Sequence, residues 1–404
     1  MESILKLRPI SEINESAFNT ENCPTKSSDE QIDVERLVLK KYGDLQARLK
    51  INSSLPELLK DQHRSYLFDN ISYLSSRYEC LDASRPWLCY WILHPLSLMG
   101  ITLDNRRKAS IARFLSKCQN PDGGFGGGPG QFSHLAATYA AVNSLVILGT
   151  EEALNTINRK TLQDFLWRVR QPDGSFAMHV GGEVDIRGAY CALSVASLAG
   201  VMTPELFDRT AEWIVSCQTY EGGFSGCPGM EAHGGYAFCG LAALVILNKG
   251  HLIDEQALLR WLVNRQMKLE GGFQGRTNKL VDGCYSFWQG GAFPLLYSLL
   301  DKAGNMPSDH LFNECALQEY LLVCCQNPDG GLLDKPGKPS DIYHTCYTLS
   351  GLSVAQHFKG IRVLSSRKNT VMTTHSLYNI RTDMVRKALL HFNNLGLPAE
   401  KNST

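Results

Sequence analysis

Versions of the segment Cys118-Gln119-Asn120-Pro121-Asp122-Gly123-Gly124-Phe125 recur along the chain, and this recurrence is the strongest indication of its architecture. The later versions are Arg170-Gln171-Pro172-Asp173-Gly174-Ser175-Phe176, Cys217-Gln218-Thr219-Tyr220-Glu221-Gly222-Gly223-Phe224, Arg265-Gln266 with Gly271-Gly272-Phe273, and Cys325-Gln326-Asn327-Pro328-Asp329-Gly330-Gly331-Leu332. Successive glutamines are 47 to 60 residues apart. Self-similarity at a nearly fixed period is typical of a repeat architecture.

Each repeat has the pattern of a helical hairpin. An amphipathic helix ends at the glutamine, a turn rich in Pro and Gly follows, and a second, apolar helix begins. The second helices are expected at 134–148, 186–198, 235–247, 285–300 and 343–355. Together with a further helix pair over 56–100, the pattern predicts an all-α fold of about six hairpins.

Hairpins of this kind stack as an open solenoid or close into a ring, and periodicity alone does not distinguish the two. Aromatic residues on the second helices fall just after the Gly-rich turns, where they would gather at one rim. This placement favours an α/α toroid with the apolar second helices around a central cavity. The aromatic residues are Trp87, Trp91, Tyr139, Tyr190, Tyr236, Trp288, Tyr343 and Tyr347.

Composition excludes several classes of protein. Lys+Arg and Asp+Glu are both 40 among the 404 residues, so no global charge indicates nucleic-acid binding. No run reaches the roughly 18 apolar residues of a membrane span, and no signal-peptide core is present. We therefore expect a cytoplasmic protein in which the 13 cysteines are mostly buried free thiols. We expect a poorly ordered tail over 1–35, the toroid over 36–380 and a C-terminal tail over 381–404.

One short segment, Leu280 to Gly291, carries more chemistry than a helix start needs. Asp282 and Cys284 lie where a loop ends, Tyr285 opens a helix, and two cations, Arg276 and Lys279, lie just upstream. Taken alone, each residue has an ordinary structural interpretation: an N-cap, a buried thiol, a solvated basic pair.

Longer motifs resemble those of the protein prenyltransferase β subunits, and most of all the members that transfer farnesyl. The resemblance covers roughly residues 60 to 380. It rests on the repeats and on the segments Ser84-Arg85-Pro86-Trp87-Leu88-Cys89-Tyr90-Trp91, Glu231-Ala232-His233-Gly234-Gly235-Tyr236, Gly275-Arg276-Thr277-Asn278-Lys279-Leu280-Val281-Asp282-Gly283-Cys284-Tyr285 and Asp341-Ile342-Tyr343-His344-Thr345-Cys346-Tyr347.

The resemblance implies an obligate heterodimer with a helical-repeat α subunit, a zinc ion, farnesyl diphosphate and protein substrates that end in a Cys-aliphatic-aliphatic-X (CaaX) motif. It implies Asp282, Cys284 and His344 as zinc ligands, with the fourth position open to the substrate cysteine. It also implies Asp334 as the residue associated with magnesium, which would assist departure of the diphosphate. The residues implied in catalysis are Asp282, Cys284, His344, Tyr285 and Lys279.

The resemblance further implies the residues that contact the two substrates. Diphosphate departure needs cations and hydrogen-bond donors where negative charge develops. For farnesyl diphosphate the residues are Tyr139, Arg187, Tyr190, His233, Gly234, Gly235, Tyr236, Cys239, Arg276, Thr277, Asn278, Lys279, Tyr285, Ser286, Phe287 and Trp288. For the peptide they are Trp87, Trp91, Arg187 and Tyr343. A Trp at position 87 is expected to close the cavity floor and to select the 15-carbon chain, and the bulky Tyr347 has the same effect.

Three alternatives remain at this point. The nearest is a geranylgeranyl-specific relative, against which Trp87 and Asp334 argue. A terpene cyclase would need an acidic protonating cluster such as Asp-x-Asp-Asp, which the sequence lacks. A non-catalytic helical-repeat scaffold would give Asp282, Cys284 and His344 no reason to converge.

Overall fold

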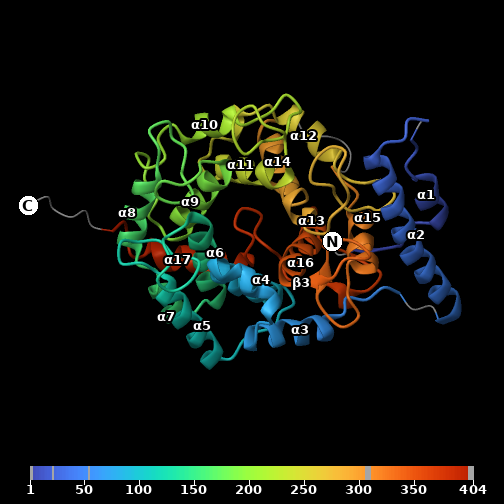
Figure 1. The fold of residues 1–404 in the computed structure, drawn as a ribbon, viewed down its shortest axis with the longest axis horizontal. Helices are drawn as coiled ribbons and strands as arrows, with labels where there is room; N and C mark the ends of the chain where they lie inside the picture. Colours follow the sequence, from blue (N-terminus) through green and yellow to red (C-terminus); the bar gives the residue numbers. More distant parts are fainter. Residues whose placement is uncertain (1–2, 21, 53–54, 305–310, 399–404) are drawn as a thin grey trace, which may run out of the picture.

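Apolar helices that follow the Gly-rich turns form the inner layer of a ring (Figure 1). The computed structural model describes residues 3–20, 22–52, 55–304 and 311–398. The inner helices are α4 (Arg85–Leu98), α6 (Leu135–Leu148), α9 (Ile186–Leu198), α11 (Gly234–Ile246), α13 (Tyr285–Trp288) with α14 (Ala292–Lys302), and α16 (Ile342–His357). Each contacts the next, and α16 contacts α4. The ring is therefore closed, which confirms the α/α toroid and excludes the open solenoid.

A second set of helices forms the outer layer. They are α3 (Lys60–Ser72), α5 (Asn105–Cys118), α8 (Arg159–Val169), α10 (Thr210–Ser216), α12 (Glu255–Val263) and α15 (Glu314–Glu319), which continues as a π-helical turn over Tyr320–Cys324. In α5, for example, Ala112, Leu115 and Cys118 are buried while Arg113 is exposed. Helix α5 thus buries one stripe against the inner layer, whereas α15 is buried at five of its six residues.

In four of the five repeats the glutamine joins one hairpin to the next, whereas Gln171 donates to the carbonyl of Val169 at 3.0 Å. In those four, the side-chain Oε1 accepts a hydrogen bond from the backbone N–H of the residue that caps the following outer helix. The pairs are Gln119 with Asn158 (2.9 Å), Gln218 with Asp254 (3.0 Å), Gln266 with Asn313 (2.8 Å) and Gln326 with Leu59 (2.8 Å). Because Leu59 precedes α3, the last repeat is bonded to the first hairpin of the ring.

The turns between the two layers require glycine where φ is positive and the backbone of a neighbouring outer helix is very close, as at Gly123 and Gly330. Gly123 has φ +100°, and a Cβ there would lie 1.7 Å from the carbonyl oxygen of Thr161 in the next outer helix. Gly330 has φ +107° and lies close to α3, with its would-be Cβ 2.5 Å from the Gln62 oxygen. A side chain at either position would push neighbouring repeats apart.

The fifth inner helix departs from the prediction of one helix over 285–300. It is divided into α13 and α14, and Gly290 and Gly291 lie between the two segments. Two consecutive glycines have low helix propensity, which accounts for the break.

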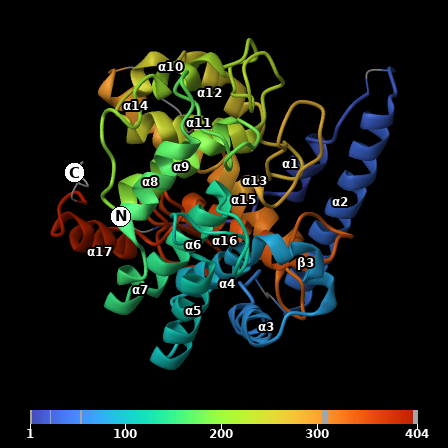
Figure 2. The same cartoon turned by 60° about the vertical axis from the view of Figure 1, so that its left-hand side comes forward.

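The expectation of a poorly ordered tail over residues 1–35 is wrong for the part that the structure describes. This segment contains β1 (Ser3–Leu5), α1 (Ile10–Glu15) and the start of α2 (Lys26–Asn52). Arg8 forms a buried ion pair with Glu319, and the Gln31 amide donates to Glu270 at 2.7 Å. The partners lie more than 200 residues away, so local composition did not reveal them. Both views place α1 and α2 at the edge of the ring beside α15 (Figure 1, Figure 2).

The C-terminal segment also differs from the tail predicted over 381–404. Helix α17 (Thr382–Asn393) packs against α6 and α9 through Val385, Ala388 and Phe392. Residues 399–404 lie outside the described part of the chain.

The remaining elements are short. Parallel pairing joins β1 to β4 (Arg362–Leu364), and β2 (Leu332–Leu333) pairs antiparallel with β3 (Ser340–Asp341). The others are α7 (Glu151–Asn155) and 3-10 turns at Ser76–Ser84, Gly250–Leu252 and Arg367–Asn369. Within the described residues, no helix combines the length and apolar character needed to cross a lipid bilayer.

Candidate active site

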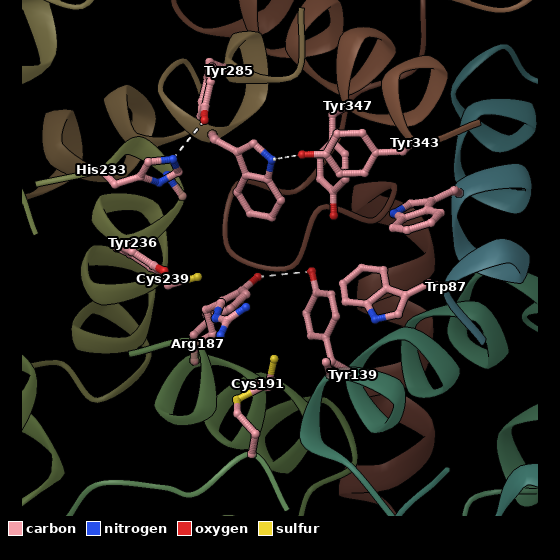
Figure 3. Close-up of a pocket in the computed structure, with 16 residues that line it drawn as sticks. Trp87, Tyr139, Arg187, Cys191, His233, Tyr236, Cys239, Tyr285, Tyr343 and Tyr347 are labelled. Carbon is pink, nitrogen blue, oxygen red and sulfur yellow. Dashed lines mark hydrogen bonds between the residues drawn. The ribbon is translucent and has the colours of Figure 1, made fainter. Parts of the chain in front are cut away.

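A cavity of about 400 Å³ opens among the inner helices at the rim where they begin (Figure 3). Its volume lies in the usual range for small-molecule sites. It is lined by Trp87, Trp91, Ala136, Tyr139, Met178, Arg187, Tyr190, Cys191, His233, Gly235, Tyr236, Cys239, Tyr285, Trp288, Tyr343 and Tyr347. Most of these side chains are apolar or aromatic, so the cavity suits a long hydrocarbon.

Aromatic rings pack against one another along one wall. The ring centroids of Trp87 and Trp91 are 5.4 Å apart, and those of Trp87 and Tyr139 are 5.6 Å apart. Trp91 meets Tyr343 edge to face at 5.3 Å. Contacts of this kind hold the rings in fixed positions, so Trp87 forms a rigid boundary of the cavity.

Two hydrogen-bonding groups lie at the opposite side, where His233 faces Tyr285 (Figure 3). The His233 Nδ1 accepts from the Gly235 backbone N–H at 3.1 Å, so its proton resides on Nε2. That Nε2–H then donates to the Tyr285 hydroxyl, 2.9 Å away. Burial, with a smaller effect of nearby Arg276, lowers the pKa of His233 and keeps it neutral. The hydroxyl proton of Tyr285 is thereby left to donate to a ligand.

Arg187 on α9 is fixed by Asp185, which also caps that helix. The carboxylate accepts from Nε of Arg187 at 3.0 Å and from Nη2 at 2.5 Å. Asp185 is thus the ion-pair partner of Arg187, and the nearby Glu183 is instead 3.8 Å from His179. The fixed guanidinium is presented at the cavity wall.

Asp282, Cys284 and His344 come together beside this cavity: Asp282 lies in the loop before α13, Cys284 is the N-cap of α13, and His344 is in the first turn of α16. Their donor atoms all lie within 4.8 Å of one another. The adjacent residues Tyr285 and Tyr343 line the cavity, so the cluster lies directly behind its wall. The segment that supplies Asp282 is anchored where the Gly283 N–H donates to the Asp334 carbonyl at 2.7 Å.

Asp341 orients the histidine of this cluster. Its carboxylate accepts from Nδ1 of His344 at 2.6 Å, while Nε2 lies 3.2 Å from Asp282. Burial opposes protonation, but the hydrogen bonds with Asp282 and Asp341 outweigh it and raise the pKa of His344 to about 10. A histidine that binds a metal through one ring nitrogen usually donates the N–H of its other ring nitrogen to a carboxylate, as Nδ1 of His344 does here.

The donor set fits a zinc ion. A thiol, an imidazole and a carboxylate are the ligands that zinc accepts, and three protein ligands leave one position open. Burial and the Asp282 charge raise the pKa of Cys284 far above its usual value, so a thiolate there requires a cation. Within the described residues, this is the one group of His, Cys, Asp and Glu side chains with metal-binding spacing.

Asp334, the residue that we expected to be associated with magnesium, lies in the β2–β3 loop. Burial and the neighbouring Asp282 raise its pKa, whereas Lys335 opposes the shift. The Lys335 Nζ lies 2.5 Å from both of its carboxylate oxygens. The carboxylate is thus already paired and does not offer a free ligand to a divalent cation.

The structure separates the predicted substrate residues into two groups. The first group lines the cavity. It consists of Trp87, Trp91, Tyr139, Arg187, Tyr190, His233, Gly235, Tyr236, Cys239, Tyr285, Trp288 and Tyr343. Those outside the lining are Gly234, Arg276, Thr277, Asn278, Lys279, Ser286 and Phe287. Ser286 and Phe287 are buried in the core, and Thr277, Asn278 and Lys279 line a different cavity. Their predicted role in binding stays a prediction.

Sequence reasoning missed some lining residues. Ala136, Met178 and Cys191 belong to the cavity wall but to no motif. Helical spacing was the available signal, because Ala136 lies three residues before Tyr139 on α6 and therefore shares its face. Asp341 was also not singled out, although it lies three residues before His344 at the start of the same helix.

The fold and the site together define a prenyltransferase of the α/α toroid type. The family model described as the prenyltransferase alpha-alpha toroid domain matches residues 58–380. The chain is 42% identical over 389 residues to the protein farnesyltransferase subunit beta of Arabidopsis thaliana, across 82% of this chain and 80% of that relative. It is 43% identical over 376 residues to the corresponding subunit of Pisum sativum, across 77% of this chain and 90% of that relative. The chain belongs to the protein farnesyltransferase β-subunit family.

A solved structure supports the fold. Candida albicans protein geranylgeranyltransferase-I, complexed with GGPP, superposes with a TM-score of 0.71 over 83% of this chain and 99% of that chain. The identity is 23%, so this similarity concerns the architecture alone.

Proposed function

We propose that this chain is the catalytic β subunit of a protein farnesyltransferase. It would transfer farnesyl from farnesyl diphosphate to the cysteine of a C-terminal CaaX motif. The observation that carries the proposal is the convergence of Asp282, Cys284 and His344 directly behind the wall of an aromatic cavity. An inert helical scaffold would gain nothing from this arrangement.

The reaction joins the substrate sulfur to C1 of the farnesyl group as the bond from C1 to the diphosphate oxygen breaks. The thiol proton passes to solvent, and the electron pair of the broken bond leaves with the diphosphate. Asp282, Cys284 and His344 would hold one zinc ion, with Asp341 fixing the imidazole through Nδ1. When bound, zinc acts as a Lewis acid that favours the thiolate of the substrate over the thiol.

The cavity would hold the isoprenoid and the end of the peptide. Aromatic side chains from the inner helices exclude water from the hydrocarbon. Arg187, held by Asp185, is placed to bind a peptide carboxylate or a carbonyl at the rim. Trp87 bounds the cavity and favours the 15-carbon chain over the 20-carbon chain, which argues against the geranylgeranyl alternative.

Negative charge that develops on the diphosphate would be met by Tyr285 and His233. The neutral imidazole donates to Tyr285, and the Tyr285 proton is then directed at the leaving group. Arg276, paired with Glu231 at the rim, would add a cation on the same side. Lys279 faces the neighbouring cavity, so a contact with the diphosphate would need its side chain to turn.

The proposal includes a partner and a second metal. A helical-repeat α subunit would complete an obligate heterodimer, and CaaX proteins would be the substrates. Magnesium would assist departure of the diphosphate only after Lys335 has released the Asp334 carboxylate.

The decisive experiment measures transfer of labelled isoprenoid to a CaaX peptide by the chain co-expressed with a cognate α subunit. Farnesyl and geranylgeranyl diphosphates are compared side by side, with Cys284→Ala as the inactive variant and Cys80→Ala, at an exposed cysteine, as the control. Farnesyl transfer that is lost with Cys284 and with zinc chelation supports the proposal. Preferred transfer of geranylgeranyl, or transfer of neither group by a folded heterodimer, contradicts it.

A further inference from the structure

Two buried carboxyl groups meet where the N-terminal segment, residues 3–20 and 22–52, lies against the ring. Glu270, in the Gly-rich turn of the fourth repeat, is 0% exposed, and Glu35 on α2 is 6% exposed. The amide nitrogen of Gln31 donates to Oε1 of Glu270 at 2.7 Å and to Oε1 of Glu35 at 3.1 Å. One amide therefore bridges an acid of the ring and an acid of the segment, which we call the carboxyl pair. The pair lies at the edge of the ring where α2 is seen in Figure 1.

No cation balances the carboxyl pair. Among the residues that the structure describes, no Lys, Arg or His nitrogen lies at ion-pairing distance from either carboxylate. Arg8 acts on Glu270 electrostatically, but its guanidinium is engaged in an ion pair with Glu319. The other titratable groups that face Glu270 are Tyr42, whose hydroxyl donates to the Glu270 carbonyl at 2.9 Å, and the Cys324 thiol. Neither of these groups supplies a positive charge.

The two acids of the pair differ in their hydrogen bonds. Both oxygens of Glu35 also accept from the Phe18 backbone N–H, at 3.1 Å and 3.0 Å, whereas Oε2 of Glu270 is buried without a hydrogen-bond partner. An ionised Glu270 would place a charge beside Glu35 without a counter-ion, and its neutral form leaves only one polar atom unpaired. Burial raises the pKa of Glu270 to about 7, the Gln31 hydrogen bond opposes the shift, and Glu35 adds to it.

We propose that the carboxyl pair makes attachment of the N-terminal segment to the ring dependent on pH. The proton on Glu270 stabilises the attached state, and its loss places a charge beside Glu35 in a buried site. Because the pKa of Glu270 is higher in the attached state than in the released state, attachment is tightest below about pH 4.5 and weakens until the pH passes about 7. The pairing of β1 with β4 and the burial of Val34 and Val38 do not titrate, so the segment loosens and does not leave the ring.

Loosening of the segment would uncover the loop that leads to the metal ligands. Phe18, Ser28 and Gln31 line a cavity of about 600 Å³ together with residues 277–280. The N-terminal segment thus covers one side of a loop that ends two residues before Asp282. Loss of the Glu270 proton would therefore increase the exposure of this loop to solvent.

The test is hydrogen exchange of the heterodimer between pH 5.5 and 7.5, followed by mass spectrometry. Protection factors remove the direct effect of pH on the exchange chemistry. In the parent, protection of the α2 amides should fall by about tenfold or more over this range, whereas protection of α9 in the inner layer should not fall. Glu270→Gln keeps an oxygen that can accept from Gln31 but cannot ionise, so it should lose most of this dependence. A remainder can come from Glu319, whose pKa is raised by burial against the effect of Arg8.

Two further variants sharpen the test. Glu205→Gln makes the same change at an exposed position between α9 and α10 and should behave like the parent. Glu35→Gln keeps the titrating acid and removes the neighbouring charge, so its dependence should move to lower pH.

The proposal is overturned if protection of α2 in the parent does not change with pH, if Glu270→Gln keeps the full dependence, or if the dependence of Glu35→Gln is not shifted. A parallel fall in α9 also overturns it, because the whole ring would then be opening. Hydrogen exchange does not need catalysis, so this proposal and the proposed function fail separately.

Discussion

The ammonium group of Lys335 lies 2.5 Å from both carboxylate oxygens of its neighbour, Asp334. Only 10% of the Lys335 side chain and 17% of the Asp334 side chain are exposed, so the pair is largely shielded from solvent. The backbone of Asp334 is fixed as well, because its carbonyl accepts from Gly283 and from the Tyr320 hydroxyl. A divalent cation that uses this carboxylate therefore competes with a resident ammonium.

This competition predicts that Lys335→Met tightens binding of a divalent cation to the heterodimer with a diphosphate ligand. We expect an increase of about tenfold, because one charge-assisted pair no longer has to be broken. Paramagnetic resonance of Mn²⁺ measures the affinity without turnover. Lys338→Met, at an exposed position of the same loop, is the control. Unchanged Mn²⁺ affinity in Lys335→Met would show that the pair does not compete with the metal.

Asp341→Asn should weaken zinc binding without disturbing the helix. In the parent, the Asp341 side chain caps α16 by accepting from the His344 N–H at 2.8 Å, and an asparagine oxygen can do the same. Asparagine does not hold Nδ1 of His344 as the second carboxylate oxygen does. Loss of such a partner typically costs about 10-fold to 100-fold in metal affinity. Competition with a chromogenic chelator measures this. Asp329→Asn, exposed in the turn before β2, is the control, and equal zinc affinity in both variants would contradict the role of Asp341.

Tyr285→Phe should lower the rate constant for transfer by about tenfold and leave the Michaelis constant for the peptide nearly unchanged. The ring would still line the cavity, but the hydrogen bond from its hydroxyl to the departing diphosphate would be lost. Single-turnover measurements separate the chemical step from product release. A variant with normal single-turnover rates would remove Tyr285 from the proposed diphosphate site.

Trp87→Thr should shift the preference toward geranylgeranyl diphosphate by about tenfold or more in kcat/KM. The indole packs against Trp91 and Tyr139, so its removal opens space at the cavity boundary for a longer chain. Competition between the two labelled diphosphates gives the ratio directly. Trp167→Thr, on the outer helix α8, controls for loss of a tryptophan elsewhere. If the farnesyl preference survives, another part of the wall sets the chain length.

Stability should fall in mild acid because of two buried histidines. Burial lowers the pKa of His63 to about 4 and that of His94 to about 3. The unfolded chain takes up protons below pH 6.5 and the folded chain does not, so stability is lost as the pH falls from about 6.5 toward these values. Each histidine contributes up to about 1.4 kcal/mol per pH unit.

His94→Gln tests this dependence, since a neutral amide can still reach the Asn379 side chain that His94 contacts at 3.1 Å. Urea unfolding of the heterodimer between pH 7.5 and 5 should show a shallower decline for His94→Gln than for the parent. His251→Gln, exposed in the 3-10 turn at Gly250–Leu252, should decline like the parent. Parallel declines in all three proteins would contradict the prediction.

The repeats allowed the toroid and the convergence of Asp282, Cys284 and His344 to be predicted, because both depend on motifs that recur or that match a family. The N-terminal helices escaped prediction, since Arg8 and Gln31 are buried by partners on α15 and beside α12 that lie far away in sequence. The direction in which Lys279 faces was also beyond sequence reasoning. Neighbouring positions on one loop line different cavities, and only the fold of that loop decides between them.

The glutamine of the fifth repeat, bonded to the backbone of Leu59, means that the ring has no first and no last unit. An open array of helical hairpins can lose a terminal unit and become shorter. Here removal of any hairpin would break two neighbour contacts and leave the remaining arc with both ends exposed. The toroid should therefore tolerate new chain ends placed between hairpins, as in a circular permutant, far better than it tolerates the loss of any one of them.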